Sequence, residues 1–249
     1  MTDFSGHTVF VTGAAAGIGF GIGAAFHAAG GRVALGDVNP SGLSRAAERL
    51  GASDRVVTHA VDVRDASSVE KFVAASESAL GPVTIAVANA GIFPNCPVLE
   101  MTQEEWDRVI ETNMRGVFFT CQAAARRMVA AKTQGKIITI SSGAHNSGRK
   151  GAAHYCALKA GVVMFTKVLA MELGPHHVNV NCIAPGLVTV DRDVSQVSDE
   201  LVTTLVGNIP WGRAGVVYPT GKYVLYGDGV NQAYQWVWIP AIPPPPPPR

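Results

Sequence analysis

Six short apolar runs alternate with longer helical stretches along most of the chain, and this alternation constrains the fold more than any other feature. The apolar runs are rich in valine and isoleucine and cover residues 7–12, 31–37, 54–62, 83–91, 135–142 and 178–186. The alanine-rich stretches between them predict helices near residues 17–29, 41–50, 65–80, 102–132 and 155–173. Strands that are apolar throughout are typical of a parallel sheet that helices cover on both faces. The pattern therefore predicts an α/β fold, a doubly wound parallel sheet in three α/β/α layers.

The size of the chain fits one large domain followed by a tail. Its 249 residues are 47% hydrophobic and 16% charged, which is enough apolar material for one sizeable core. We expect a single domain over residues 1–239, with an atypical end at 214–239 where tyrosine and tryptophan accumulate. Residues 240–249 contain six consecutive prolines and are expected to form a solvated proline-rich tail.

Charge and hydropathy exclude several classes of protein. The formal net charge is +1, so electrostatics gives no reason to expect nucleic acid or an anionic membrane as a partner. The first residues lack both a basic segment and a long apolar core, and no apolar run reaches the roughly 20 residues of a membrane span. We expect a cytoplasmic enzyme.

A glycine-rich turn follows the first apolar run and opens the first helix. Gly13, Gly17 and Gly19 stand in the segment VFVTGAAAGIG. Glycines at this place let the backbone approach a pyrophosphate, and the amino end of the helix stabilises its charge. Small residues also help a helix to pack closely on a sheet, so the turn alone is weak evidence for a nucleotide site.

An acidic residue at the end of the second run strengthens the nucleotide hypothesis. Asp37 comes 18 residues after Gly19, where a carboxylate accepts hydrogen bonds from an adenosine ribose. The same charge would repel a 2′-phosphate, and Ala16 offers no basic side chain to compensate, so we expect NAD rather than NADP. The alternative is a polar strand end that caps the turn after it. Asp62 and Gly91 end the next two runs, at the same rim. We expect Asp62 to accept a hydrogen bond from the adenine amine, and Gly91 to let the cofactor approach the backbone closely.

A tyrosine and a lysine stand four positions apart in the run 153–161. Residues at this spacing share one face of a helix, so Tyr155 and Lys159 can reach one site. A nearby ammonium favours the phenolate form and lowers the pKa of a phenol, which makes Tyr155 a candidate proton donor and acceptor. Ser142, at the end of the fifth run, can hold a substrate oxygen beside that phenol. Surface pairs with this spacing are common, but a pair that follows the glycine turn, Asp37 and the serine is not.

Together these segments resemble the short-chain dehydrogenase/reductase family, in its short single-domain form with a Rossmann fold. The resemblance runs from about residue 5 to residue 213 and includes TGAAAGIG at 12–19, NAG at 89–91 and TNMRG at 112–116. It implies hydride transfer between a nicotinamide cofactor and a secondary alcohol or ketone. It also implies a catalytic tetrad, with Lys159 on the nicotinamide ribose and a water-linked proton relay at the asparagine: Asn113, Ser142, Tyr155 and Lys159.

The resemblance also implies which residues contact the ligands. Residues 187–212 correspond to the loop that covers the substrate, and Thr189 comes one position earlier than usual. The cofactor contacts it implies are Gly13, Ala16, Gly17, Ile18, Gly19, Asp37, Val38, Asp62, Val63, Asn89, Ala90, Gly91, Tyr155, Lys159, Pro185, Gly186, Val188 and Thr189. The candidate substrate contacts are Asn95, Ser142, Ala144, His145 and Tyr155. Asn146 and His154 also lie near the expected pocket, and for the histidines a structural role is the alternative.

The chain departs from the family pattern after IPWGRAG. Relatives insert a helix of some 20 residues and then a final strand, whereas this chain continues directly with VVYPTGKYVLYGDG. Because a parallel crossover needs a dozen or more residues, either the last strand is reached by a very short connection or residues 216–249 pack differently. The helices at 102–132 and 155–173 form one dimer contact in the family, so we expect a homodimer or homotetramer.

The spacing of histidines and cysteines in the sequence gives little reason to expect a metal site or a catalytic thiol. His176 and His177 are adjacent and would point to opposite faces of a strand, so no metal site is expected. The cysteines are too widely spaced for a redox or metal motif and are interpreted as free thiols: Cys96, Cys121, Cys156 and Cys182. A nucleophilic Cys156 is the alternative to that interpretation.

Two functions remain open from the sequence. The first is an NAD-dependent oxidoreductase acting on a small alcohol or ketone. The second is a non-catalytic sensor or scaffold that binds the dinucleotide but has lost its substrate pocket at the altered carboxyl end.

Overall fold

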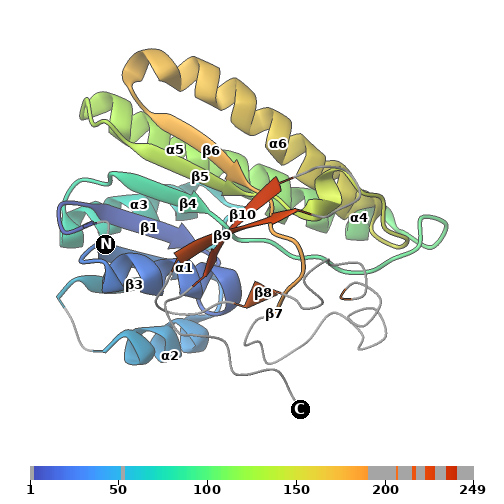
Figure 1. Cartoon of the computed structure of the whole chain (residues 1–249), viewed down its shortest axis with the longest axis horizontal. Helices are drawn as coiled ribbons and strands as arrows, with labels where there is room; N and C mark the ends of the chain where they lie inside the picture. Colours follow the sequence, from blue (N-terminus) through green and yellow to red (C-terminus); the bar gives the residue numbers. More distant parts are fainter. Residues whose placement is uncertain are drawn as a thin grey trace.

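The computed structural model contains one six-stranded parallel sheet with the strand order β3-β2-β1-β4-β5-β6 (Figure 1). The structure describes residues 3–51, 54–189 and 206 and the strands at 215–216, 222–227 and 234–239. The strands of the main sheet are β1 Thr8–Thr12, β2 Arg32–Asp37, β3 Val56–Ala60, β4 Ile85–Ala88, β5 Lys136–Ile140 and β6 Asn179–Ile183. The predicted doubly wound sheet is confirmed, and the strand order reverses between β1 and β4, where such folds bind their ligands.

Helices cover both faces of this sheet. They are α1 Gly17–Ala28, α2 Pro40–Leu50, α3 Ala66–Leu80, α4 Gln103–Ile110, α5 Gly116–Ala130 and α6 Ala153–Leu173. Helices α3, α5 and α6 lie on one face, and α1 and α2 lie on the other (Figure 1). The predicted three-layer arrangement is therefore present.

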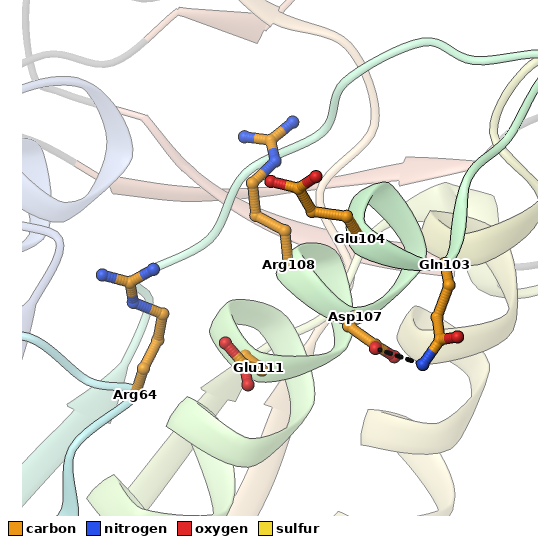
Figure 2. Close-up of a pocket in the computed structure, with 6 residues that line it drawn as sticks. All are labelled: Arg64, Gln103, Glu104, Asp107, Arg108 and Glu111. Atoms are coloured by element: carbon orange, nitrogen blue, oxygen red, sulfur yellow. Dashed lines mark hydrogen bonds between the residues drawn. The ribbon is translucent and has the colours of Figure 1, made fainter.

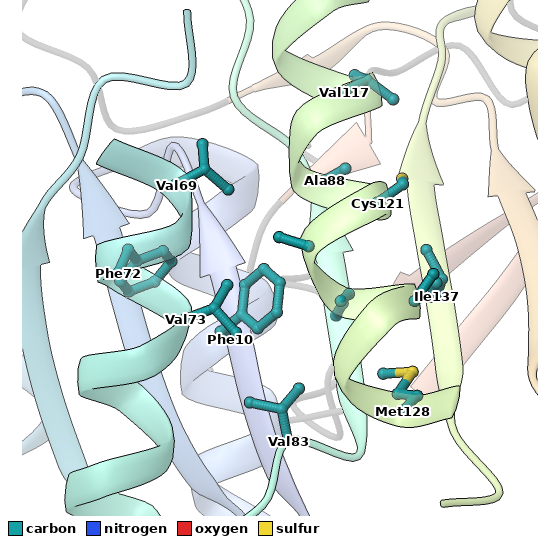
Figure 3. Packing of buried hydrophobic residues seen from close by; sticks show 14 of the residues in the cluster. Phe10, Val69, Phe72, Val73, Val83, Ala88, Val117, Cys121, Met128 and Ile137 are labelled. Atoms are coloured by element: carbon teal, nitrogen blue, oxygen red, sulfur yellow. The ribbon is translucent and has the colours of Figure 1, made fainter. Parts of the chain in front are cut away.

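Alternate residues of each strand supply the two cores. In β1, Phe10 packs with α3 and α5, while Val9 and Val11 pack with α1 and α2. The ring of Phe10 meets that of Phe72 edge to face, with 5.5 Å between centroids, and Figure 3 shows this pair among the valines of α3. Because both faces of the strand are buried, its three central residues, 9–11, are all apolar and do not alternate with polar ones.

The long helical stretch at 102–132 is interrupted by a π-helical turn. Residues Glu111–Arg115 form this turn, η1, between α4 and α5. A π-turn adds one residue to a helical turn and often marks a functional position. Asn113 lies inside it and is fully buried.

Among the described residues, the strands from position 188 onward form two small sheets apart from the main one. Strands β9 Lys222–Gly227 and β10 Tyr234–Ile239 pair antiparallel with each other, and β7 Val188–Thr189 pairs in parallel with β8 Gly215–Val216. Strand β10 contacts β6 (Figure 1). In the described strands, this pairing differs from a last strand added to the main sheet by a short crossover. Most of the substrate loop predicted at 187–212, and the tail at 240–249, lie outside the described residues.

Two further features concern the helices of the described residues. Two 3-10 turns, η2 Gly143–His145 and η3 Gly174–His176, precede α6 and β6 respectively. Within the described part of the chain, no helix is both long and apolar enough to cross a membrane.

Candidate active site

The glycine turn between β1 and α1 has the backbone conformation that requires glycine. Gly13 and Gly17 have φ angles of 65° and 60°, in the left-handed region that side chains disfavour. A Cβ atom at Gly19 would collide with the carbonyl oxygen of Gly13 and the side-chain amide of Asn89. The three glycines predicted from the sequence are thus needed to bring the turn, the helix and the end of β4 together.

Asn89 fastens the glycine turn to the end of β4. Its Nδ2 donates to the carbonyl oxygens of Thr12 and Gly13, at 2.9 and 3.0 Å. In return, Thr12 Oγ1 accepts from the backbone N–H groups of Asn89 and Ala90, at 3.1 and 3.3 Å. The NAG segment therefore holds the carboxyl ends of β1 and β4 in one rigid unit.

The amino end of α1 differs from those of the next three helices. No side chain caps its first turn, whereas Asn39, Asp65 and Thr102 accept backbone hydrogen bonds at the starts of α2, α3 and α4. An uncapped helix start next to a glycine turn presents N–H groups and a positive dipole to an anion. These residues fit the pyrophosphate of a dinucleotide.

Two carboxylates lie at the rim where the rest of a dinucleotide would extend. Asp37 ends β2, and its Oδ2 accepts from the backbone N–H of Ala15 at 3.1 Å, which fixes it beside the glycine turn. Asp62 follows β3 and is paired with Arg64, whose Nη2 lies 2.7 Å from Oδ2. The hydrogen bond from Arg64 lowers the pKa of Asp62. Val38 and Val63 are the next residues of the two loops, the first exposed and the second buried.

Tyr155 and Lys159 meet at the carboxyl edge of the sheet, on the first turns of α6. The Nζ atom of Lys159 lies 5.6 Å from the centroid of the Tyr155 ring. It donates to the carbonyl oxygen of Ile140 at the end of β5, at 2.8 Å. Burial lowers the pKa of Lys159 to about 8, since only 4% of the residue is exposed. The lysine is thus a buried cation anchored at the strand end.

Ser142 lies between β5 and α6. Its Oγ accepts from the backbone N–H of Ala144 at 3.2 Å, and it caps the turn η2. The next residue, Gly143, donates to the carbonyl oxygen of Pro185 at 2.8 Å. Residues 185–186 therefore lie against the serine turn. The neighbouring Ser141 donates to the carbonyl of Lys159 at 2.8 Å and ties β5 to α6.

Asn113 is held by the loop after β4. Its Oδ1 accepts from the backbone N–H of Ile92 at 2.8 Å, and its Nδ2 donates to the carbonyl of the same residue at 2.6 Å. A Cβ atom on Gly91 would lie 3.0 Å from Oδ1, so the glycine permits this close approach. Both polar atoms of the asparagine side chain are therefore in use within the fold.

The side chains predicted to contact the substrate, and His154 near them, differ in exposure and in hydrogen-bond partners. Nδ1 of His145 donates to the carbonyl oxygen of Ser142 at 2.8 Å, and Asn95 is exposed beside Gly151. His154 is fully buried, and its Nδ1 accepts from the backbone N–H of Tyr155 at 2.9 Å. Its Nε2 lies 3.8 Å from Glu105 on α4, and burial lowers its pKa. His154 is therefore buried where α4 approaches the start of α6, and its Nε2 has no hydrogen-bond partner among the described residues.

Two residues beside the tyrosine carried no specific prediction. The ring of Phe93 lies 6.0 Å from that of Tyr155, and the guanidinium carbon of Arg149 lies 5.9 Å from the same ring. Both belong to loops, where no periodic pattern indicates which side chains turn inward. Their only signal is their position in the loops that follow β4 and β5.

The cysteines and the possible metal ligands of the described residues do not form a site. The four cysteines are free thiols, and burial raises the pKa of Cys121. No group of three or more side chains able to hold a metal ion occurs in residues 3–51 and 54–189 or the later strands. His176 and His177 lie in and after η3 rather than in a strand.

A hollow of about 480 Å³ lies beside α4 and η1. It is lined by Arg64, Gln103, Glu104, Asp107, Arg108 and Glu111. Figure 2 shows charges of both signs around it and a hydrogen bond between Gln103 and Asp107. None of the residues predicted to be catalytic lines it, so the candidate site is the rim at the ends of β1, β4, β5 and β6.

Comparison with known proteins gives one consistent family. The sequence profile of the short chain dehydrogenase family matches residues 7–201. A sorbitol dehydrogenase from Cereibacter sphaeroides is 38% identical over 183 residues, which cover 74% of this chain and 71% of that protein. A 3-oxoacyl-acyl-carrier-protein reductase from Escherichia coli strain K12 is 35% identical over 232 residues, 93% of each chain.

The solved structures agree with the sequence relatives. A short-chain type dehydrogenase/reductase from Mycobacterium marinum matches with a TM-score of 0.77 and 35% identity, over 86% of this chain and 85% of that one. The matched region of the family profile includes both the glycine turn and the segment from Ser142 to Lys159.

Proposed function

The chain belongs to the short-chain dehydrogenase/reductase family and is an oxidoreductase that acts on CH–OH groups, and we propose that it transfers a hydride between NAD and a secondary alcohol or ketone. The observation that carries this proposal is the buried ammonium of Lys159, 5.6 Å from the ring of Tyr155, at the edge of the sheet where the glycine turn opens. Members of the family bind a nicotinamide dinucleotide.

The roles of the residues follow from their chemistry. A bound nicotinamide dinucleotide supplies the hydride or accepts it. The phenol of Tyr155 gives a proton to the substrate oxygen during reduction and takes it back during oxidation. The charge of Lys159 favours the phenolate, and the two Nζ donors that do not bond to Ile140 remain for the ribose and for a water. The hydroxyl of Ser142 holds the substrate oxygen beside the phenol.

Asn113 organises the route by which protons reach solvent. Because both polar atoms of its side chain bond to Ile92, we assign this role to the main chain of the π-helical turn η1. A π-turn leaves backbone carbonyl groups outside the regular helical pattern, and such a group can hold a water.

The preference for NAD rests on Asp37. The backbone N–H of Ala15 keeps its carboxylate beside the glycine turn, where the adenosine ribose of the cofactor would lie. A carboxylate at this place accepts hydrogen bonds from ribose hydroxyls and repels a 2′-phosphate.

We also propose that the protein forms a homodimer through α5 and α6. Three apolar side chains stand on one face of α6 at positions i, i+4 and i+7 and are exposed: Met164, Val168 and Met171. Phe118 of α5 is 39% exposed, and its ring lies 6.1 Å from that of Phe165 on α6. A continuous apolar stripe of this kind is unusual on a monomer.

The experiment is a comparison of wild type with Tyr155→Phe. We expect wild type to consume NADH with some member of a panel of ketones, and to prefer NADH over NADPH. The variant should bind NADH with similar affinity, measured by its fluorescence, but turn over about 100- to 10,000-fold more slowly. Near-normal turnover by the variant would contradict the mechanism.

The rival function is a dinucleotide sensor without catalysis. The pairing of β9 with β10 in a sheet of their own, as far as the carboxyl end is described, favours it. A sensor binds NADH but consumes none with any alcohol or ketone, so the same assay separates the two functions.

A further inference from the structure

We propose that Arg149 recognises an anionic group, a carboxylate or a phosphate, on the substrate. The inference rests on the proposed function, because it concerns the same site. It narrows the substrate class from any small alcohol or ketone to one that carries such a group near the reacting carbon.

The position of Arg149 places a second cation beside the reacting phenol. Its guanidinium carbon lies 5.9 Å from the centroid of the Tyr155 ring, and Lys159 Nζ lies 5.6 Å from the same point. Arg149 belongs to the loop between η2 and α6, and the backbone N–H of Ala152 donates to its carbonyl at 3.1 Å. Another bond, from Cys96 N–H to the carbonyl of Gly151 at 2.7 Å, joins this loop to the one after β4.

The hydrogen-bonding capacity of Arg149 is not used within the described part of the chain. The residue is half-buried, and its Nε atom is buried without a hydrogen-bond partner. A buried donor that lacks an acceptor is costly, and the face of an aromatic ring supplies no lone pair. An incoming carboxylate or phosphate supplies two oxygens in the fork geometry that a guanidinium matches.

The charge around the phenol is also unbalanced. No aspartate or glutamate occurs in the sequence between Glu111 and Glu172, a stretch that includes Arg149, Lys150 and Lys159. Among the described residues, no carboxylate forms an ion pair with Arg149 or Lys159. Glu105, which approaches His154 at the start of α6, is already bound by Arg108 through Nη2 at 2.8 Å. Arg149 and the buried ammonium of Lys159 thus lie beside the same ring without a carboxylate partner in the part of the chain that the structure describes, and an anionic substrate group would supply one.

The test compares pairs of ketones that differ in one anionic group. The carboxylate pair is 3-oxobutanoate and its methyl ester, and the phosphate pair is dihydroxyacetone phosphate and dihydroxyacetone. For wild type we expect kcat/KM to be higher for the charged member of one pair, and the pair that responds identifies the anion. In Arg149→Gln, the charged-to-neutral ratio for that pair should fall about tenfold or more, since a hydrogen bond to a charged group is lost.

Lys150→Gln is the matched control. It removes one positive charge from the same loop, but its side chain is exposed, and we expect the ratio to stay within about twofold of wild type. Arg149→Lys keeps the charge and loses the fork, so its ratio should lie between those of wild type and Arg149→Gln. Circular dichroism and NADH binding verify that each variant is folded.

Three results would overturn the inference. The first is a wild type whose kcat/KM shows no preference for either anion. The second is an equal loss of kcat/KM for both members of a pair in Arg149→Gln, as expected of a residue that only stabilises the phenolate. The third is a charged-to-neutral ratio in Lys150→Gln that falls as far as in Arg149→Gln. Turnover of neutral ketones alone would reject this inference and leave the proposed function intact. If no compound is turned over, calorimetry measures the binding of the two anions to the NADH-bound protein. Binding that Arg149→Gln abolishes supports the anion site and rejects the hydride-transfer function. If neither anion binds, the anion site is rejected.

Discussion

At the scale of single residues, Lys159 shows how burial changes the chemistry of a side chain. The residue is 4% exposed, and its Nζ has one protein acceptor, the carbonyl of Ile140. Removal from water lowers its pKa from 10.5 to about 8. In the mechanism that we propose, this ammonium lies 5.6 Å from the centroid of the Tyr155 ring, in surroundings of low dielectric constant where electrostatic interactions are stronger than in water.

This low pKa gives a pH dependence of stability in the protein without cofactor. Below about pH 8 the lysine is protonated in both states, and folding carries the full cost of burying the charge. Between about pH 8 and 10.5 the native state has released the proton but the unfolded chain has not, so stability rises with pH. The free energy of unfolding should increase by about 3 kcal/mol across this window relative to Lys159→Met.

Urea unfolding at several pH values from 7 to 10.5 measures this difference. Lys150→Met serves as the control, because Lys150 is exposed and its removal should leave the pH dependence of wild type unchanged. If the curves of wild type and Lys159→Met run parallel, Lys159 does not titrate in this window.

At the scale of elements, the start of α1 depends on its contacts with two strands. The helix lacks a side-chain cap and relies on the glycine turn, which Asn89 fastens to β4. The absence of a Cβ at Gly19 is what permits Gly13 and Asn89 to approach it. The start of α1 is thus held by tertiary contacts and not by a side-chain cap.

Gly19→Ala should therefore show whether the helix propensity of alanine or the steric clash at the glycine turn has the larger effect. Alanine favours a helix by about 1 kcal/mol over glycine, but here its Cβ meets backbone that cannot move away. We expect a lower melting temperature and loss of NADH binding by calorimetry. Gly161→Ala, in α6, is the matched control: its Cβ meets only Met114 Sδ at 3.7 Å, so the variant should be as stable as wild type or more stable. Normal NADH binding by Gly19→Ala would show that the turn tolerates a side chain.

At the scale of the whole molecule, the outer face of α5 and α6 carries the exposed apolar stripe through which we propose that two copies associate. Met164 and Met171 are 58% and 78% exposed, and they stand about two helical turns apart on α6. Their burial against an identical stripe would remove apolar surface from water twice, once in each copy.

Charge on this stripe should separate the copies. We expect Met164→Asp combined with Val168→Asp to shift the protein from dimer to monomer in light scattering after size-exclusion chromatography, because each charge would be buried without a partner. Leu99→Asp introduces the same charge on a fully exposed leucine outside the stripe and should leave the assembly unchanged. A dimer that survives the double substitution would place the contact elsewhere.

Local patterns in the sequence determined the elements and the type of site. Apolar runs and helical stretches have periods of a few residues, and Gly13, Asp37, Tyr155 and Lys159 stand at the ends of elements, so their places at one rim follow from parallel strand order. The carboxyl end was open in the sequence, because the short connection to β9 allowed two pairings that local pattern cannot distinguish.

Only the tertiary structure decided the surroundings of each side chain. The π-turn at Asn113, the burial of His154 against Glu105 and the approach of Arg149 to Tyr155 depend on contacts between residues far apart in the chain or in loops without periodicity. The pKa of Lys159 belongs to this class too, because desolvation is set by everything that packs around the amine. Sequence determined which groups stand at the edge of the sheet, because strand ends follow from local pattern, and packing determined the burial and hydrogen bonds of each group, because these depend on contacts distant in the chain.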